Sequence, residues 1–132
     1  MTELKRILII EDTPEWVRTH KNLLGEIFIE NPPVIDICFS AKDGFIQALS
    51  AKYDLIITDL EMEKIPNEYY AGDWFLKNIL NREQFKETKF LIISGAYNIR
   101  DIAEKYKVDY VPKSSLISNP LSLKYKLESL YQ

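Results

Sequence analysis

The chain has 132 residues, which is enough for one domain with a buried core and too few for a second. Its hydrophobic fraction of 46% and charged fraction of 28% are those of an ordinary folded domain and argue against disordered, collagen-like and coiled-coil classes. The net charge of -3 comes from interspersed acidic and basic residues, which leave no basic patch for a phosphate backbone, so we expect no direct contact with nucleic acid.

Signals of membrane insertion or export are missing from the sequence. No apolar run approaches the ~20 residues that span a bilayer. The N-terminus from Met1 to Arg6 lacks the apolar core and cleavage site of a signal peptide. We therefore expect a cytoplasmic protein without membrane contacts. The single cysteine, Cys38, has no partner for an internal disulfide and lies in an apolar stretch, which predicts a buried structural thiol.

Five short apolar runs with many β-branched residues predict strands. In chain order they cover residues 7–10, 34–39, 55–57, 90–93 and the weaker 110–111. The first, third and fourth contain no polar residue, as expected of strands buried on both faces, whereas the second contains Asp36 and the fifth is very short. We expect the second and fifth strands at the edges of the sheet.

Five helical patterns, with apolar residues at i, i+3 and i+4, alternate with these strands. They are marked by apolar residues at 16–28, 45–49, 75–80, 99–106 and 123–130. Pro14 precedes the first and Asn119-Pro120 the last, both suitable for a helix start. His20 has no second histidine or cysteine at ligand spacing, so we interpret it as a packing or surface residue. Trp16 and Trp74 are interpreted as structural.

Alternating strands and helices predict a parallel sheet covered on both faces, because each parallel connection needs a crossover helix. With the second and fifth strands at the edges, the pattern fits one α/β domain over residues 1–132. The predicted fold is a flavodoxin-like, doubly wound, five-stranded sheet in the order 2-1-3-4-5. Ligands bind to such sheets beyond the carboxyl ends of the strands, so the residues at those ends carry the functional prediction.

Polar residues follow four of the predicted strands. Glu11 and Asp12 end the first, Asp59 ends the third, Ser94 ends the fourth, and the fifth runs into Lys113. Because the first and third strands are neighbours, their three carboxylates should share one crevice, where mutual repulsion requires a cation. Oxygen ligands alone suit Mg²⁺, which keeps waters and leaves room for a phosphoryl oxygen.

This set of groups fits phosphoryl transfer to an aspartate. A carboxylate can attack phosphorus and form an acyl phosphate, while a metal ion, an ammonium and a hydroxyl neutralise the transferring oxygens. Asp59, Mg²⁺, Lys113 and Ser94 supply these groups. Taken singly, a strand-end carboxylate is more often a helix cap and a serine a turn residue, so the prediction depends on the joint pattern.

Five segments resemble bacterial response-regulator receiver domains of the chemotaxis type, and the likeness covers nearly the whole chain. The segments are residues 7–12 (ILIIED), 41–44 (AKDG), 59–62 (DLEM), 94–96 (SGA) and 110–113 (YVPK). The resemblance implies that Asp12 binds Mg²⁺ directly and Glu11 through water. The backbone carbonyl of Glu61 would be a further ligand, and Asp59 would be both ligand and phosphoacceptor.

The resemblance also implies a switch. Ser94 would hydrogen-bond the phosphoryl group and Lys113 would pair with it, while Tyr110 matches the family's switch aromatic; plain core packing of Tyr110 is the alternative. A histidine kinase or histidine phosphotransfer protein would supply the phosphoryl group. No effector domain follows the last predicted helix, so a stand-alone receiver acting on a downstream protein target in trans is expected.

The sequence departs from the family pattern at two loops. Ser114 follows Lys113 where many receivers have a proline, so the family's cis peptide is not expected. Glu63 replaces another common proline, and a usual glycine is delayed to Gly72, which implies an insertion of about five residues. We predict an extended, exposed loop at 64–71, either a spacer or a segment that contacts a partner or covers the site.

Two other functions stay open. The altered loops fit a degenerate receiver that binds partners without phosphorylation. Asp59-Leu60-Glu61 also has a superficial similarity to the Asp-x-Asp motif of haloacid-dehalogenase phosphohydrolases, although there the motif follows the first core strand and uses a second acid. We expect a signalling phosphoacceptor rather than an enzyme, with weak intrinsic phosphotransfer and autodephosphorylation activity.

Overall fold

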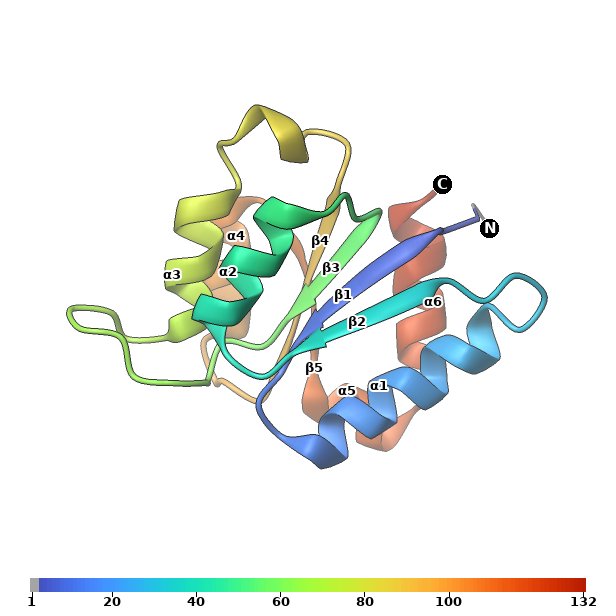
Figure 1. Cartoon of the computed structure of the whole chain (residues 1–132). Coiled ribbons are helices and arrows are strands. Elements are labelled where there is room, and N and C mark those ends of the chain that lie inside the picture. The colour runs from blue at the N-terminus through green and yellow to red at the C-terminus, as the bar shows by residue number, and fades with distance from the viewer. Residues whose placement is uncertain (1–2) are drawn as a thin grey trace.

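Five parallel strands form one sheet in the predicted order β2-β1-β3-β4-β5. The computed structural model describes residues 3–132 and is drawn in Figure 1. The strands are β1 (Arg6–Ile10), β2 (Val34–Cys38), β3 (Leu55–Thr58), β4 (Lys89–Ser94) and β5 (Asp109–Pro112). The two strands with polar or short sequences, β2 and β5, are the edges, and their residues are mostly half-buried. The predicted fold class is confirmed.

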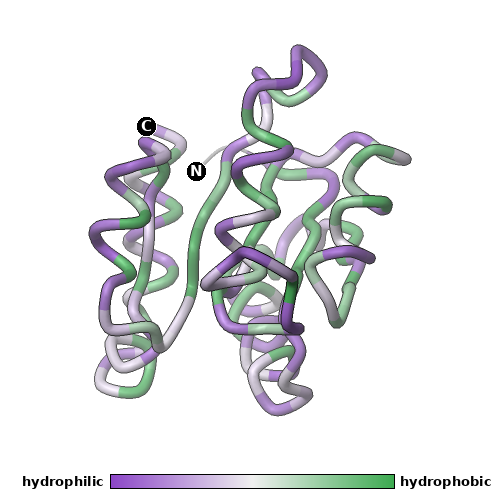
Figure 2. The backbone as a smooth tube through the Cα atoms, turned by 90° about the vertical axis from the view of Figure 1, so that its left-hand side faces the viewer, coloured by the Kyte–Doolittle hydropathy of each residue, from purple (hydrophilic) through white to green (hydrophobic). Residues whose placement is uncertain are grey.

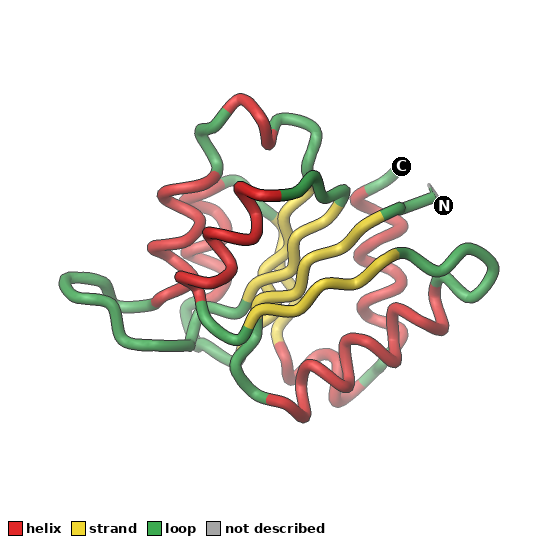
Figure 3. The backbone as a smooth tube through the Cα atoms, in the orientation of Figure 1, coloured by secondary structure: helices red, strands yellow, loops and turns green. Residues whose placement is uncertain are grey.

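Helices cover both faces of the sheet, as Figure 3 shows. The helices α2 (Ala41–Ser50), α3 (Ala71–Ile79) and α4 (Ile99–Tyr106) contribute to the core on one face. The helices α1 (Pro14–Ile27), α5 (Lys113–Ser118) and α6 (Leu121–Leu130) contribute to the core on the other. Hydrophobic and hydrophilic residues alternate along the helices in Figure 2, as expected when one side of each helix packs on a sheet.

The uninterrupted apolar runs are explained by this two-sided packing. Successive side chains of a strand point to opposite faces, so every residue of a central strand needs an apolar partner. The side chains that face α2, α3 and α4 include Leu8, Ile10, Ile56 and Ile92, all fully buried. Those that face α1, α5 and α6 include Ile7, Ile9, Leu55, Ile57, Leu91 and Ile93, also buried.

Three sequence predictions need correction. Within residues 3–132 there are six α-helices rather than five, because the short α5 (Lys113–Ser118) follows β5 directly and has only Leu116 buried, too little for a periodic signal. Cys38 is half-buried rather than buried, since it ends the edge strand β2. In the predicted exposed loop at 64–71, Ile65 and Tyr70 are buried in the core beneath α3.

Other local predictions are confirmed. Helix α1 begins at Pro14, and His20 is a packing residue, only 1% exposed. All peptide bonds in the described range 3–132 are trans, in agreement with Ser114 after Lys113. No helix in the part of the chain that the structure describes combines the length and the apolar character needed to cross a membrane.

Candidate functional site

The first residue after β1 and the first residue after β3 continue the hydrogen bonding of the sheet. The Glu11 N–H donates to the Cys38 carbonyl at 3.0 Å, and the Asp59 N–H donates to the Ile10 carbonyl at 3.0 Å. Because β1 and β3 are paired up to Ile10 and Thr58, the residues that follow lie next to each other at the carboxyl edge. The sheet itself therefore holds the carboxylates of Glu11 and Asp59 in one place.

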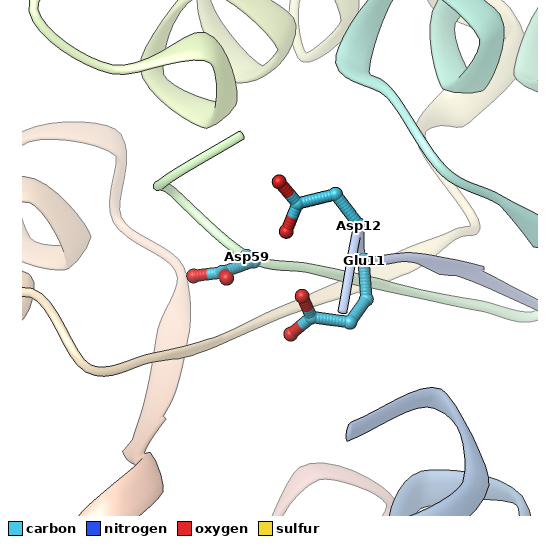
Figure 4. Close-up of side chains that lie close together, drawn as sticks. All are labelled: Glu11, Asp12 and Asp59. Carbon is cyan, nitrogen blue, oxygen red and sulfur yellow. The ribbon is translucent and has the colours of Figure 1, made fainter. Parts of the chain in front are cut away.

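Three carboxylates meet at this edge, as predicted. Glu11, Asp12 and Asp59 each offer an oxygen within 4.8 Å of the others, and Figure 4 shows their side chains at the ends of β1 and β3. Glu11 and Asp59 are buried, at 1% and 3% exposure, whereas Asp12 is exposed. The Oδ1 atom of Asp59 accepts a hydrogen bond from the Leu60 N–H at 2.7 Å. The site is thus open to solvent on the Asp12 side.

Lys113 completes the cluster from the start of α5. Its Nζ lies 2.8 Å from Oε1 of Glu11 and 2.9 Å from Oδ2 of Asp59. Burial favours the neutral amine, but the two carboxylates outweigh it, so the pKa of Lys113 lies above its ordinary value. The lysine therefore carries its charge at neutral pH and faces the oxygen of Asp59 that the backbone does not hold.

The surroundings of the Glu11 carboxyl disfavour its ionised form. Burial raises its pKa to about 7, the Asp59 charge adds to the rise, and Lys113 and the Thr13 N–H oppose it. Oε2 accepts the hydrogen bond from the Thr13 N–H at 3.0 Å. Oε1 is buried and touches Lys113 only as an ion pair, without a hydrogen bond of good angle. An added positive charge would favour the ionised form of Glu11.

The donor set fits a divalent cation. Three carboxylates face one ammonium, so the fully ionised cluster has an excess of two negative charges. Among residues 3–132, no donor forms a hydrogen bond with the buried Oε1 of Glu11, so this oxygen is available to a cation. All available ligand atoms are oxygens, the type that Mg²⁺ binds in proteins. Glu11, Asp12 and Asp59 can hold such an ion; the carbonyl of Glu61 stays a predicted ligand.

Ser94 and Tyr110 lie where the strand assignment predicted, but their roles remain predictions. Ser94 is fully buried at the end of β4, opposite Pro112, and its Oγ accepts a hydrogen bond from the Ala96 N–H at 3.2 Å. Tyr110 is half-buried opposite Ile92 and packs against the core beneath α3 and α4. The packing interpretation of Tyr110 describes this state of the protein.

Two residues near the site were not recognised as functional from the sequence. The Trp16 ring lies under the ammonium of Lys113, with Nζ 5.0 Å from the ring centroid. A weak signal existed, since Trp16 lies in the first turn of the helix that follows Asp12. Thr13 supplies the backbone N–H that holds Glu11, and no side-chain pattern could have indicated that contact.

The loop between β3 and α3 is anchored by Glu63. Its carboxylate accepts hydrogen bonds from the Ala41 N–H at 2.7 Å and the Lys42 N–H at 2.9 Å, at the start of α2. The anionic side chain thus caps a neighbouring helix and ties down the segment that follows Asp59. Since Ile65 and Tyr70 are core residues, the large aromatic side chain that this loop exposes is that of Tyr69, which is 79% exposed.

We expect Glu63→Gln to lower the free energy of unfolding by about 1 kcal/mol, because a charged cap of two backbone N–H groups becomes a neutral one. Urea unfolding at neutral pH measures the change. Glu83→Gln is the matched control, since Glu83 is exposed and, within residues 3–132, its carboxylate pairs with the exposed Lys86 alone. We expect the control to stay within about 0.5 kcal/mol of the wild type; equal effects of both changes would remove the capping role.

Solved receiver domains share this fold over nearly the whole chain. A response regulator receiver domain (CheY-like) from Methylobacillus flagellatus is 25% identical, with a TM-score of 0.74 and coverage of 96% of this chain and 98% of that one. The response regulator TrrA from Thermotoga maritima, solved in complex with Mg²⁺-BeF, is 27% identical, with a TM-score of 0.68 and the same coverage.

The phosphorylated cyanobacterial phytochrome response regulator RcpA is 20% identical, with a TM-score of 0.73 and coverage of 96% of this chain and 92% of that one. At that identity the likeness concerns the fold alone. No protein-family model and no curated protein matches the sequence. Over nearly its whole length, then, the chain has the fold of the CheY-like response regulator receiver domains, with an acidic pocket at the carboxyl edge of its sheet.

Proposed function

We propose that the protein is a phosphoacceptor of a two-component phosphorelay, in which Asp59 receives a phosphoryl group in a Mg²⁺-dependent site. The environment of Asp59 carries the proposal: a buried carboxylate lies beside two others, with Lys113 2.9 Å from its Oδ2. A histidine kinase or histidine phosphotransfer protein would be the donor, and a downstream protein would read the result. The expected cytoplasmic location belongs to the same proposal.

Each residue around Asp59 would have its own role in the phosphoryl transfer. The Leu60 N–H holds Oδ1 of Asp59 and thereby fixes the carboxylate for attack on phosphorus. Lys113 would move from the carboxylate to a phosphoryl oxygen and neutralise charge there, and Ser94 would donate a hydrogen bond to the same group. A bound Mg²⁺ ion would supply further neutralisation of the phosphoryl oxygens. Turnover of phosphate esters is not part of the proposal.

Acetyl phosphate labelling tests the proposal. Incubation with Mg²⁺ and acetyl phosphate should add one phosphoryl group to the protein, visible in the intact mass and removed by hydroxylamine, as an acyl phosphate is. EDTA should prevent the reaction. An unlabelled wild-type protein under these conditions would favour the alternative, a receiver fold that binds partners without phosphorylation.

Removal of either charged neighbour of Asp59 should affect Mg²⁺ binding differently. We expect Asp12→Asn to weaken Mg²⁺ binding by about tenfold or more, because it removes a carboxylate ligand. Lys113→Ala should leave the affinity unchanged or raise it, because it removes a positive charge beside the ion. Calorimetric titration measures both, with the exposed Asp101→Asn as a control for net charge. Tighter binding by the Asp12 variant than by the Lys113 variant would overturn these assignments.

A further inference from the structure

Lys113 has a third contact in addition to its two carboxylate partners. Its ammonium lies 5.0 Å from the centroid of the Trp16 ring, within the range of a cation–π interaction. The lysine side chain is only 13% exposed, so solvent screens this contact weakly. Trp16 comes from the first turn of α1, whereas Lys113 begins α5; the two meet only in the folded protein.

The ammonium of Lys113 has three neighbours: it donates a hydrogen bond to Asp59, forms an ion pair with Glu11 and lies over the ring of Trp16. Lysine has three N–H groups, and the carboxylates of Glu11 and Asp59 occupy one side of Nζ. Trp16 presents an aromatic ring where the ammonium would otherwise need water or a third acceptor. Tryptophan has the most favourable ring face for a cation, and the contact is worth more where water is excluded.

Trp16 is itself held in position. Its ring packs on the core between α1, α5 and α6 and lies 5.8 Å, centroid to centroid, from the ring of the buried His20. Burial, together with the charge of Lys113, lowers the pKa of His20 to about 4, so this neighbour of the tryptophan is neutral at physiological pH. A neutral, buried imidazole can pack beside the Trp16 ring without repelling the ammonium of Lys113.

We propose that Trp16 is a positioning residue, which holds the ammonium of Lys113 at the site through a cation–π contact. A lysine has a long flexible stem, and its ordering at a reaction centre is entropically costly. Trp16 restricts the lysine side chain, and the ammonium stays in contact with the ring while its anionic partner changes from Asp59 to a phosphoryl oxygen. The consequence for phosphorylation rests on the proposed function; the contact itself does not.

Fluorinated tryptophans test the contact without any ligand. The chain has two tryptophans, and Trp74 packs against Phe45 on another helix pair, so Trp74→Phe leaves Trp16 as the single probe. Added fluorines weaken the ring face and change its shape little. Across a mono- to tetrafluoro series we expect the unfolding equilibrium constant to rise by about fivefold. In the same series with Lys113→Met added, the unfolding equilibrium constant should not change, because the cation is absent.

The outcomes are distinct. If the unfolding equilibrium constant rises with the number of fluorines equally in the proteins with Lys113 and with Lys113→Met, Trp16 only fills space and the inference is wrong. A rise that occurs only in the proteins with Lys113 supports the inference. The affinity for beryllofluoride, measured by calorimetry on the same proteins with Mg²⁺, should then fall as fluorines are added. If no variant, the Trp74→Phe parent included, binds beryllofluoride while the unfolding slope persists, the proposed function fails and the positioning contact stands.

Discussion

Gly72→Ala should destabilise the protein by about 3 kcal/mol, which would be among the largest effects of a single methyl group in this chain. A Cβ atom at Gly72 would lie 2.2 Å from the Asp59 carbonyl oxygen and 2.7 Å from the Leu60 Cα. Both are backbone atoms, which cannot rotate away as a side chain can. The Gly72 N–H also donates to the Leu60 carbonyl at 3.0 Å, so the helix start and the acceptor segment are in direct contact.

Urea unfolding of Gly72→Ala and Gly25→Ala measures this effect against a matched control. Gly25 lies exposed in α1, and a Cβ there would meet no described atom within 4 Å apart from its chain neighbours and its own helix backbone, so alanine should raise stability by up to about 1 kcal/mol. Opposite signs for the two glycines are the expected result. A Gly72→Ala protein as stable as the wild type would show that α3 can move away from Asp59 without loss.

Acidification should remove about 3 kcal/mol of stability through His20. Burial lowers the pKa of His20 to about 4 in the folded protein, from an ordinary value of 6.5, with a smaller contribution from Lys113. The folded state thus favours the neutral imidazole, whose Nδ1 has no hydrogen-bond partner among the described residues. The stability is fully present above pH 6.5 and is lost as the pH falls toward 4.

The comparison of the wild type with His20→Gln isolates this effect. Burial raises the pKa of Glu11 to about 7, so the protonation of Glu11 stabilises the fold as the pH falls and opposes the loss at His20. Glu11 is present in both proteins and cancels in the difference. We expect the free energy of unfolding of His20→Gln, relative to the wild type, to rise as the pH falls from 7 to 4; a constant difference would exclude His20 as the acid-sensitive group.

The sheet and its acidic edge could be predicted from the sequence because each depends on local patterns. Runs such as Ile7 to Ile10, in which every side chain is apolar, predict a strand buried on both faces, and the strand order then brings Glu11 and Asp59 together. The late position of Gly72 predicted a loop before the third helix, and α3 begins at Ala71, after β3 has ended at Thr58. These features need no knowledge of contacts between distant side chains.

The remaining features depend on such contacts. The short α5 has one buried residue and therefore no helical period. In the loop between β3 and α3, Tyr70 turns inward and donates a hydrogen bond to Asn98 at 2.9 Å. The capping contact of Glu63 and the position of the Trp16 ring join segments that are far apart in the chain. A sequence pattern records which residues are apolar, but not which distant groups they meet.

Chemical trapping of the phosphorylated residue tests the central claim most directly. Borohydride reduces an aspartyl phosphate to homoserine, so reduction after labelling with acetyl phosphate and Mg²⁺ marks the acceptor in a peptide map. We predict homoserine at position 59 and at no other aspartate, and no trapped product from Asp59→Asn. Reduction at Asp12, or phosphoryl labelling of Asp59→Asn equal to that of the wild type, would contradict the assignment of Asp59 as the phosphoacceptor.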